Sequence, residues 1–144
     1  MKKLVFFLVI VVLASCGKKY EEKVIETYPG EKPKRVQYYT TDTDNKYKAK
    51  EVFYYENGQK KMEGEYNRDG KKHGKWFYWR EDGKMWSEGY FYEGKDDRMR
   101  KTWHENGKKH YQGKYDKGVR VGKWKFWDES GKLVKEIDYD KEKE

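Results

Sequence analysis

The sequence predicts an all-β protein, an elongated single-layer antiparallel sheet built from consecutive β-hairpins. The stretch from Gly70 to Gly94 recurs from Gly94 and again from Gly118, and a looser copy ends at Gly70. Each copy has Asn-Gly, Asp-Gly or Ser-Gly at its middle, with aromatic residues on both sides. A period of about 24 residues is typical of repeat architectures, in which each unit packs on its neighbours.

Residues 1–15 are interpreted as a bacterial lipoprotein signal peptide. Lys2 and Lys3 precede an apolar run, Leu4 to Ala14, that is too short to span a bilayer comfortably. The run ends in Leu13-Ala14-Ser15-Cys16, which resembles a bacterial lipobox, so cleavage would leave Cys16 as the lipid-bearing N-terminus. The alternative is a buried N-terminal strand or helix. The interpretation predicts a lipid-anchored protein of the bacterial cell envelope, on its periplasmic or surface face.

The rest of the chain is divided into a tether and one repeat domain. Residues 16–27 are expected to be the lipidated cysteine and a polar tether, in which only Val24 and Ile25 are apolar. Residues 28–144 form the predicted domain. It comprises a degenerate half-repeat over 28–47 and four repeats over about 48–69, 70–93, 94–117 and 118–140.

The turn of each predicted hairpin is centred on a glycine. Asn-Gly and Asp-Gly favour a two-residue type I′ turn, because both central positions of that turn need φ > 0. The four glycines assigned this structural role are Gly58, Gly83, Gly107 and Gly131.

A two-residue turn also predicts the strand pairing. It places Trp76 opposite Gly89 and Gly74 opposite Phe91, and in the last copy Trp124 opposite Ile137 and Gly122 opposite Tyr139. Aromatic rings laid over glycines compensate for the missing side chains, which makes Trp76 and Trp124 the predicted structural tryptophans.

Alternation along the strands then divides the residues between two faces. The predicted core face carries Trp76, Tyr78, Met85 and Phe91. The more polar face carries Lys75, Phe77, Trp79, Lys84, Trp86 and Glu88.

The third copy departs from this pattern. Arg98 and Arg100 stand where the second and fourth copies have a glycine and a tryptophan. A guanidinium group is expected to stack on Tyr115 there.

The segment GKKHGKWFYWREDGK resembles the MORN-repeat variant of bacterial proteins described as YwqK-like antitoxins. The similarity covers about Lys48 to Asp140, and Gly74-Lys75-Trp76 and Gly122-Lys123-Trp124 are its most specific parts. The resemblance implies consecutive β-hairpins and a non-enzymatic, partner-binding role, which includes the antitoxin role of that family.

The composition argues against nucleic acid as a partner. The chain has 34 Lys and Arg against 26 Asp and Glu, for a net charge of +8, and removal of the two lysines in residues 1–15 would leave +6. Acids alternate with the cations instead of leaving one basic stripe. With 18% aromatic residues, the chain can still bury rings in a thin sheet although 42% of its residues are charged.

No motif for catalysis, cofactor binding or metal binding is present in the sequence. The histidines occupy non-equivalent repeat positions without a recognised metal spacing, and the only cysteine is the predicted lipid site. The acids near the turns are expected to be solvated, although they could be drawn as an acid/base pair. The histidines are His73, His104 and His110, and the acids are Asp96, Asp97, Glu56, Glu81, Asp82 and Glu105. We therefore expect no enzyme, no cofactor, no metal and no small-molecule substrate.

One aromatic column is the candidate partner-binding site. Tyr54, Trp79, Trp103 and Trp127 each lie four residues before a turn glycine, on the predicted polar face, and Trp86, Tyr90 and His110 are expected to flank them. Exposed aromatic patches rimmed by charge mark interaction sites. The alternative is that these rings only support the second face of the sheet.

Three functional classes remain open on the sequence. The first is a membrane-anchored protein that binds a protein partner, such as a toxin, in an antitoxin-like or immunity-like role. The second is a structural envelope protein that contacts membrane or cell-wall polymer through its lysines. The third, a hydrolase, has no motif in its favour.

Overall fold

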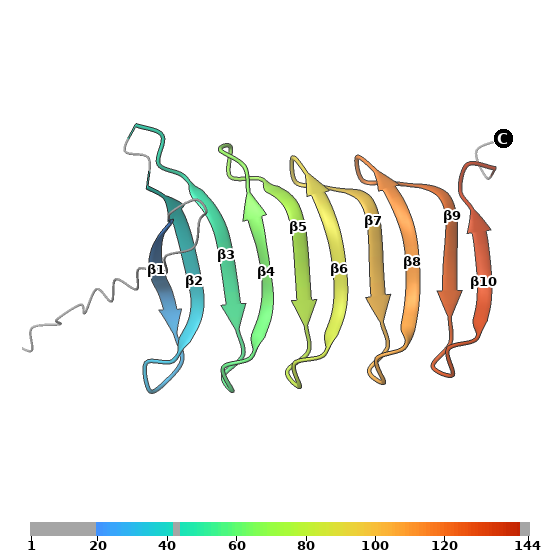
Figure 1. Cartoon of the computed structure of the whole chain (residues 1–144), viewed down its shortest axis with the longest axis horizontal. Coiled ribbons are helices and arrows are strands. Elements are labelled where there is room, and N and C mark those ends of the chain that lie inside the picture. Colours follow the sequence, from blue (N-terminus) through green and yellow to red (C-terminus); the bar gives the residue numbers. More distant parts are fainter. Residues whose placement is uncertain (1–19, 42–43, 142–144) are drawn as a thin grey trace, which may run out of the picture.

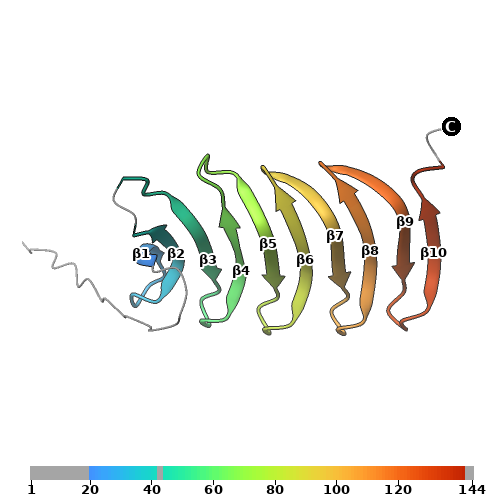
Figure 2. The same ribbon diagram turned by 45° about the horizontal axis from the view of Figure 1, so that its top comes forward.

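The chain folds into one open antiparallel sheet of ten strands, ordered as in the sequence. The structure is a computed structural model that describes residues 20–41 and 44–141, so the predicted signal peptide and Cys16 lie outside the described residues. The hairpins follow one another along the long axis, with β1 and β10 at opposite ends, and their strands are bowed (Figures 1 and 2). The predicted fold class is confirmed. The strands are β1 (Tyr20–Thr27), β2 (Pro33–Thr40), β3 (Lys48–Tyr54), β4 (Lys60–Tyr66), β5 (Lys72–Trp79), β6 (Met85–Tyr92), β7 (Lys95–Trp103), β8 (Lys109–Asp116), β9 (Val119–Trp127) and β10 (Leu133–Asp138).

The sheet begins earlier than the sequence predicted. The tether interpretation is wrong for Tyr20–Thr27, which forms β1 and pairs antiparallel with β2, for example through Val24 and Val36. Residues 28–47 are therefore not an isolated half-repeat, because they hold the turn and second strand of a hairpin whose first strand is β1. A strand at the edge of a sheet needs few buried side chains, and Val24 and Ile25 stay 47% and 43% exposed. Hydrophobic content alone therefore could not reveal it.

The Asn-Gly and Asp-Gly turns have a different form from the one predicted. The amide of Arg80 donates to the carbonyl of Lys84 at 2.8 Å, and the amide of Gly83 donates to that of Arg80 at 2.9 Å. Only the glycine has positive φ, at 82°, so residues 81–83 form a three-residue loop with a type I turn. Turns with two positive φ values occur at the opposite ends of the strands, where one hairpin connects to the next, at Glu93-Gly94 and Lys117-Gly118.

A one-residue bulge restores the predicted pairing beyond the turn. Trp79 pairs with Met85, but Tyr78 pairs with Ser87, so Trp86 is an extra residue in β6. Trp76 then lies opposite Gly89, as predicted, and Gly74 opposite Phe91. In the last hairpin Trp124 pairs with Ile137, also as predicted.

The same bulge exchanges two side chains between the faces. We call the face that bears Trp76 and Trp124 the core face, and the face that bears Trp79, Trp103 and Trp127 the second face. Met85 belongs to the second face, because it pairs with Trp79. Trp86 contacts Tyr78 on the core face, with ring centroids 5.6 Å apart. The predicted faces of Met85 and Trp86 were therefore wrong.

The buried tryptophans join each hairpin to the one before it. Trp76 and Trp124 are 0% exposed. A Cβ atom at Gly64 or Gly113 would lie 2.1 Å from the indole above it, so both positions require glycine. The strand ladder is interrupted beside each ring, and the indole N–H of Trp76 donates to the main-chain carbonyl of Glu65 at 3.1 Å. The indole N–H of Trp124 likewise donates to the main-chain carbonyl of Lys114 at 3.2 Å.

The third copy keeps this backbone despite its arginines. The φ of Arg98 is 58°, close to the 76° of Gly74 and the 63° of Gly122 at the equivalent positions. The guanidinium of Arg100 lies over Gly89, as the indoles lie over their glycines, and forms an ion pair with Asp96. Arg98 stacks on Tyr90, 4.1 Å from the ring centroid, so the predicted stacking of a guanidinium on Tyr115 was wrong.

A row of hydrogen bonds also joins the turn ends of successive hairpins. Four side chains donate to the main-chain carbonyl of the residue that ends the first strand of the next hairpin. They are Tyr28 to Tyr54 at 3.0 Å, Tyr55 to Trp79 at 2.9 Å, Arg80 to Trp103 at 3.1 Å and His104 to Trp127 at 2.8 Å.

The last hairpin differs at two contact points: the side-chain donor of this row, and the glycine that lies under the next core side chain. Asp128 occupies the donor position, and an ionised carboxylate cannot donate. Ile137 occupies the position of the glycines that lie under the next core side chain.

Candidate binding surface

The second face carries one tryptophan at the end of each of three strands. Trp79, Trp103 and Trp127 end β5, β7 and β9, and Tyr54 ends β3. Two strand spacings separate consecutive members, which is roughly 9.5 Å. All four are half-buried, so each ring is anchored and part of it faces solvent.

The tryptophans do not form a continuous aromatic strip. No ring contact joins two of them among the described residues. The ammonium of Lys60 lies 5.8 Å from the ring of Trp79, and that of Lys109 lies 5.3 Å from the ring of Trp127. Met85, from β6, pairs with Trp79. The surface is thus a stripe of separate rings with aliphatic and cationic side chains between them, which we call the tryptophan stripe.

Ion pairs border the tryptophan stripe along the sheet. Lys101 and Glu88 lie 3.0 Å apart, and Lys123 and Lys125 each lie 3.7 Å from Glu136. Towards the N-terminal end, Glu63 pairs with Lys50 at 3.2 Å and with Lys60 at 2.8 Å. Burial alone would raise the pKa of Glu63, but the two lysines lower it below the usual range. Each of these three carboxylates therefore has a cation beside it, and the lysines outnumber them.

The backbone under the stripe is fixed by the hydrogen bonds between hairpins. The carbonyls of Tyr54, Trp79, Trp103 and Trp127 are the acceptors of that row. The sequence reasoning missed the donors. Their signal is a hydrogen-bond donor three residues before each turn glycine, namely Tyr55, Arg80 and His104.

The other predicted site residues are spread over the molecule. Trp86, a predicted member of the binding site, is 39% exposed but lies on the core face, so it does not join the stripe. His104 and His110 come together, with ring centroids 4.4 Å apart. Burial and the charge of His104 lower the pKa of His110. Asp96 pairs with Arg100, and Asp82 accepts the amide of Lys84.

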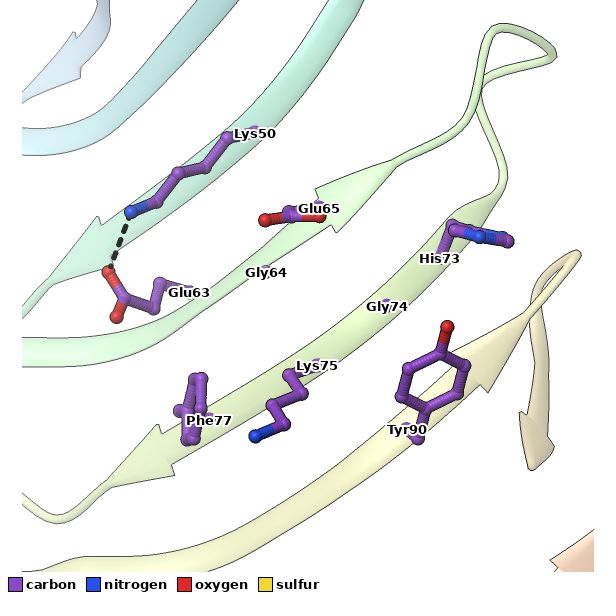
Figure 3. Close-up of a pocket in the computed structure, with 9 residues that line it drawn as sticks. All are labelled: Lys50, Glu63, Gly64, Glu65, His73, Gly74, Lys75, Phe77 and Tyr90. Atoms are coloured by element: carbon purple, nitrogen blue, oxygen red, sulfur yellow. Dashed lines mark ion pairs between the residues drawn. The ribbon is translucent and has the colours of Figure 1, made fainter. Parts of the chain in front are cut away.

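A hollow of about 500 Å³ lies on the second face between β3 and β6 (Figure 3). Its wall includes the rings of Phe77 and Tyr90. Phe77 also stacks on Trp79, with centroids 5.9 Å apart, so the hollow adjoins the first tryptophan of the stripe.

Two features are absent from the described part of the chain. No helix within residues 20–41 and 44–141 is long and apolar enough to cross a membrane. The same segments hold no cluster of three or more His, Cys, Asp or Glu side chains that could bind a metal ion.

The repeats match one known family. No curated protein and no solved structure matches the chain. The MORN repeat variant matches residues 49–68, 72–93, 99–117 and 120–141, which together make up more than half of the sequence. Each matched segment contains the turn glycine and most of one hairpin. The chain therefore belongs to the MORN repeat variant family.

Proposed function

We propose that this repeat sheet is a membrane-anchored, non-enzymatic binding protein that docks a protein partner on the tryptophan stripe. The observation that carries the proposal is the placement of Trp79, Trp103 and Trp127 in one register on a single face, each half-buried. Tryptophan is enriched among the residues that dominate binding energy at protein interfaces. Because the bordering carboxylates Glu63, Glu88 and Glu136 each have a lysine partner, a partner protein could cover them without burying an unpaired anion.

The anchor in this proposal is a lipid on Cys16. β1 begins at Tyr20, so four residue steps separate the lipid from the sheet. At full extension these steps reach roughly 14 Å. The N-terminal edge of the sheet would thus stay close to the bilayer in the bacterial envelope, with the other hairpins projecting from it or lying along it. The antitoxin-like role that the resemblance implies is one form of this function, with a toxin as the partner.

The docking proposal is tested by comparing tryptophans from opposite faces. The lipidated protein is cross-linked in its own envelope and purified, and the co-purified proteins are quantified for the wild type, Trp103→Ala and Trp86→Ala. Trp86 is the matched control because it is exposed but lies on the core face. We expect one protein to be lost with Trp103→Ala and retained with Trp86→Ala. Equal recovery with both variants would exclude the stripe as the docking site.

The structural envelope role is the second candidate, and the lysines along the stripe favour it. Contacts with an anionic polymer weaken steeply as salt rises, whereas contacts of a dry aromatic patch do not. Capture that disappears in high salt and is unaffected by Trp103→Ala would favour the polymer.

The anchor has its own test. Cys16→Ser should abolish incorporation of radiolabelled fatty acid and leave the precursor uncleaved or mislocalised. Equal labelling of the variant and the wild type would contradict the lipoprotein interpretation.

A further inference from the structure

The hollow on the second face exists because the sheet opens between β4 and β5. The pairing runs from Gly64 with Trp76 directly to Glu65 with His73, which leaves Gly74 and Lys75 without a partner on β4. The indole of Trp76 closes the gap from the core face. On the second face, Gly74 contributes no side chain beside Glu65 to fill the space. The hollow is therefore a product of the repeat geometry, and its walls are free to vary.

The walls of the hollow differ from those at the two later junctions between repeats, where β6 meets β7 and β8 meets β9. Phe77 pairs with Glu88, and the equivalent partners in the next two hairpins are Lys101 with Gln112 and Lys125 with Glu136. Tyr90 pairs with Lys75, where the later hairpins have Lys114 with Met99 and Asp138 with Lys123. The two aromatic walls occur at this junction alone, so the repeat fold itself does not require them.

The polar groups around the hollow include two opposite charges without partners. Lys75 and Glu65 are exposed and form no ion pair within the described residues, whereas Lys50 and Glu63 pair with each other (Figure 3). His73 adds a buried Nδ1 atom that has no hydrogen-bond partner. A buried polar atom without a partner costs free energy, so this part of the wall is not fully satisfied by the repeat itself. Arg98 stacks on Tyr90 and fixes that ring.

These features define the chemistry of a complementary ligand. The apolar walls suit an aromatic or aliphatic side chain, and a volume of about 500 Å³ is ample for one residue. Lys75 offers an ammonium group to a carboxylate, and Glu65 offers a carboxylate to an N–H donor. An α-carboxylate, an α-nitrogen and an apolar side chain on one carbon satisfy all three.

We propose that this hollow binds the α-carboxylate end of an apolar amino-acid residue, either as a free amino acid or as the C-terminal residue of a peptide. Lys75 holds the carboxylate, Glu65 accepts from the α-nitrogen, and Phe77 and Tyr90 contact the side chain. The site does not depend on partner docking at the tryptophan stripe.

Binding to the full chain in detergent is measured by ligand-observed NMR with four probes, phenylalanine, N-acetylphenylalanine, phenylalaninamide and the peptide Ala-Ala-Phe. Probes with a free carboxylate should bind, and phenylalaninamide should bind about tenfold more weakly or worse, because a charged hydrogen bond is lost. Tighter binding of phenylalanine than of the acetylated probe and the peptide assigns the site to free amino acids. The reverse order assigns it to peptide C-termini.

Variants copied from the later repeats keep the fold during this test. Phe77→Lys and Tyr90→Lys introduce the residue types of Lys101 and Lys114, which the same sheet accommodates. Both variants, and Lys75→Gln, should reduce binding about tenfold or more. Lys123→Gln, at the position equivalent to Lys75, should leave it unchanged.

Three results would overturn the proposal. They are no binding of any probe to the wild type at roughly 10 mM, equal binding of phenylalanine and its amide, or undiminished binding by Phe77→Lys. Because Trp103 is left intact throughout, loss of this site and loss of the docking function remain distinguishable.

Discussion

The four repeats use two kinds of side chain at the same core position. Seven residues before the turn glycine, the second and fourth repeats have Trp76 and Trp124, whereas the first and third have Glu51 and Arg100. Trp76, Trp124 and Glu51 are all at most 2% exposed, so a carboxylate is buried as deeply as an indole. The backbone of the sheet continues through both kinds of repeat.

Each core side chain lies near a charged side chain of the same strand that complements it: a cation beside an indole, or the opposite charge beside a charged group. The ammonium of Lys72 lies 4.0 Å from the ring of Trp76, and the guanidinium of Arg120 lies 4.6 Å from that of Trp124. Where the core residue is Arg100, the position equivalent to Lys72 holds Asp96.

The carboxylate of Glu51 is satisfied by several neighbours. It lies 3.4 Å from the ammonium of Lys48 and accepts hydrogen bonds from Arg35, Gln37 and Tyr66. The repeat therefore specifies a filled position with a complementary partner, and it does not specify one residue type.

The two kinds of repeat are not equally well satisfied. Each indole N–H donates to a main-chain carbonyl beside the interruption of the strand ladder. The Nε atom of Arg100, in contrast, is buried without a partner. Because an unpaired buried donor costs free energy, we infer that the core contact of Arg100 is weaker than those of Trp76 and Trp124.

The largest expected effect separates the aromatic from the charged repeats. Trp124→Ala should lower the free energy of unfolding by about 3–5 kcal/mol, because it removes a fully buried ring. Arg100→Ala should cost about 1–2 kcal/mol, since it removes an already imperfect contact. Urea denaturation of both variants provides the measurement. A cost for Arg100→Ala equal to that for Trp124→Ala would show that the charged position is as strong as the aromatic one.

A pair of substitutions can convert the third repeat to the aromatic type. Arg100→Trp alone leaves Asp96 against an indole, and Asp96→Lys alone places a second cation beside Arg100. Together they reproduce the pair formed by Trp76 and Lys72. We expect the double variant to be more stable than the two single changes predict, with a coupling free energy of about 0.5–3 kcal/mol in a denaturation cycle. Additive effects would mean that the two positions do not sense each other.

The smallest expected effect is on the stability of the first repeat at low pH, to which Glu51 contributes. Burial alone would raise the pKa of Glu51, but hydrogen bonds from Gln37, Tyr66 and Arg35 outweigh it and lower the pKa below the usual 4.5. A lowered pKa contributes stability at pH values above the unfolded value, and this contribution disappears as the pH falls through the folded value. Thermal unfolding measured below pH 4.5 should therefore be less pH-dependent in Glu51→Gln than in the wild type. An unchanged pH dependence would exclude Glu51 as a source of acid sensitivity.

The sequence predicted the repeats and the fold class. It did not reveal that each turn loop has one more residue than predicted, or that a bulge compensates for it. The pairing of Trp76 with Gly89 was predicted from a two-residue turn, yet the loop has three residues. The bulge at Trp86 offsets the additional residue, which is why the pairing was right and the face of Trp86 was wrong. Bulges leave little signal in side-chain alternation because the residues on either side of them still alternate.

The sequence was least informative about contacts between repeats. Trp76 was expected to cover a glycine of its own hairpin, but it covers Gly64 of the preceding one. The positive φ of Arg98 could not be inferred, because a bulky residue rarely adopts it. The tryptophan stripe was predicted as a column, and its members do share one register. Their separation by Met85 and by lysines depends on the neighbouring strands, whose register the turn length alone does not give.

The two altered contact points of the last hairpin have a consequence for how such a gene can evolve. An internal repeat offers its successor a glycine and a side-chain donor, so duplicating an internal unit produces a copy that fits on both sides. A copy added after the fourth repeat would meet Ile137 in place of the glycine and Asp128 in place of the donor. Duplication within the array therefore lengthens the sheet in a single event, whereas extension past the last hairpin requires further point mutations. Lineages of this family should accordingly vary in the number of their middle repeats while conserving an atypical last one.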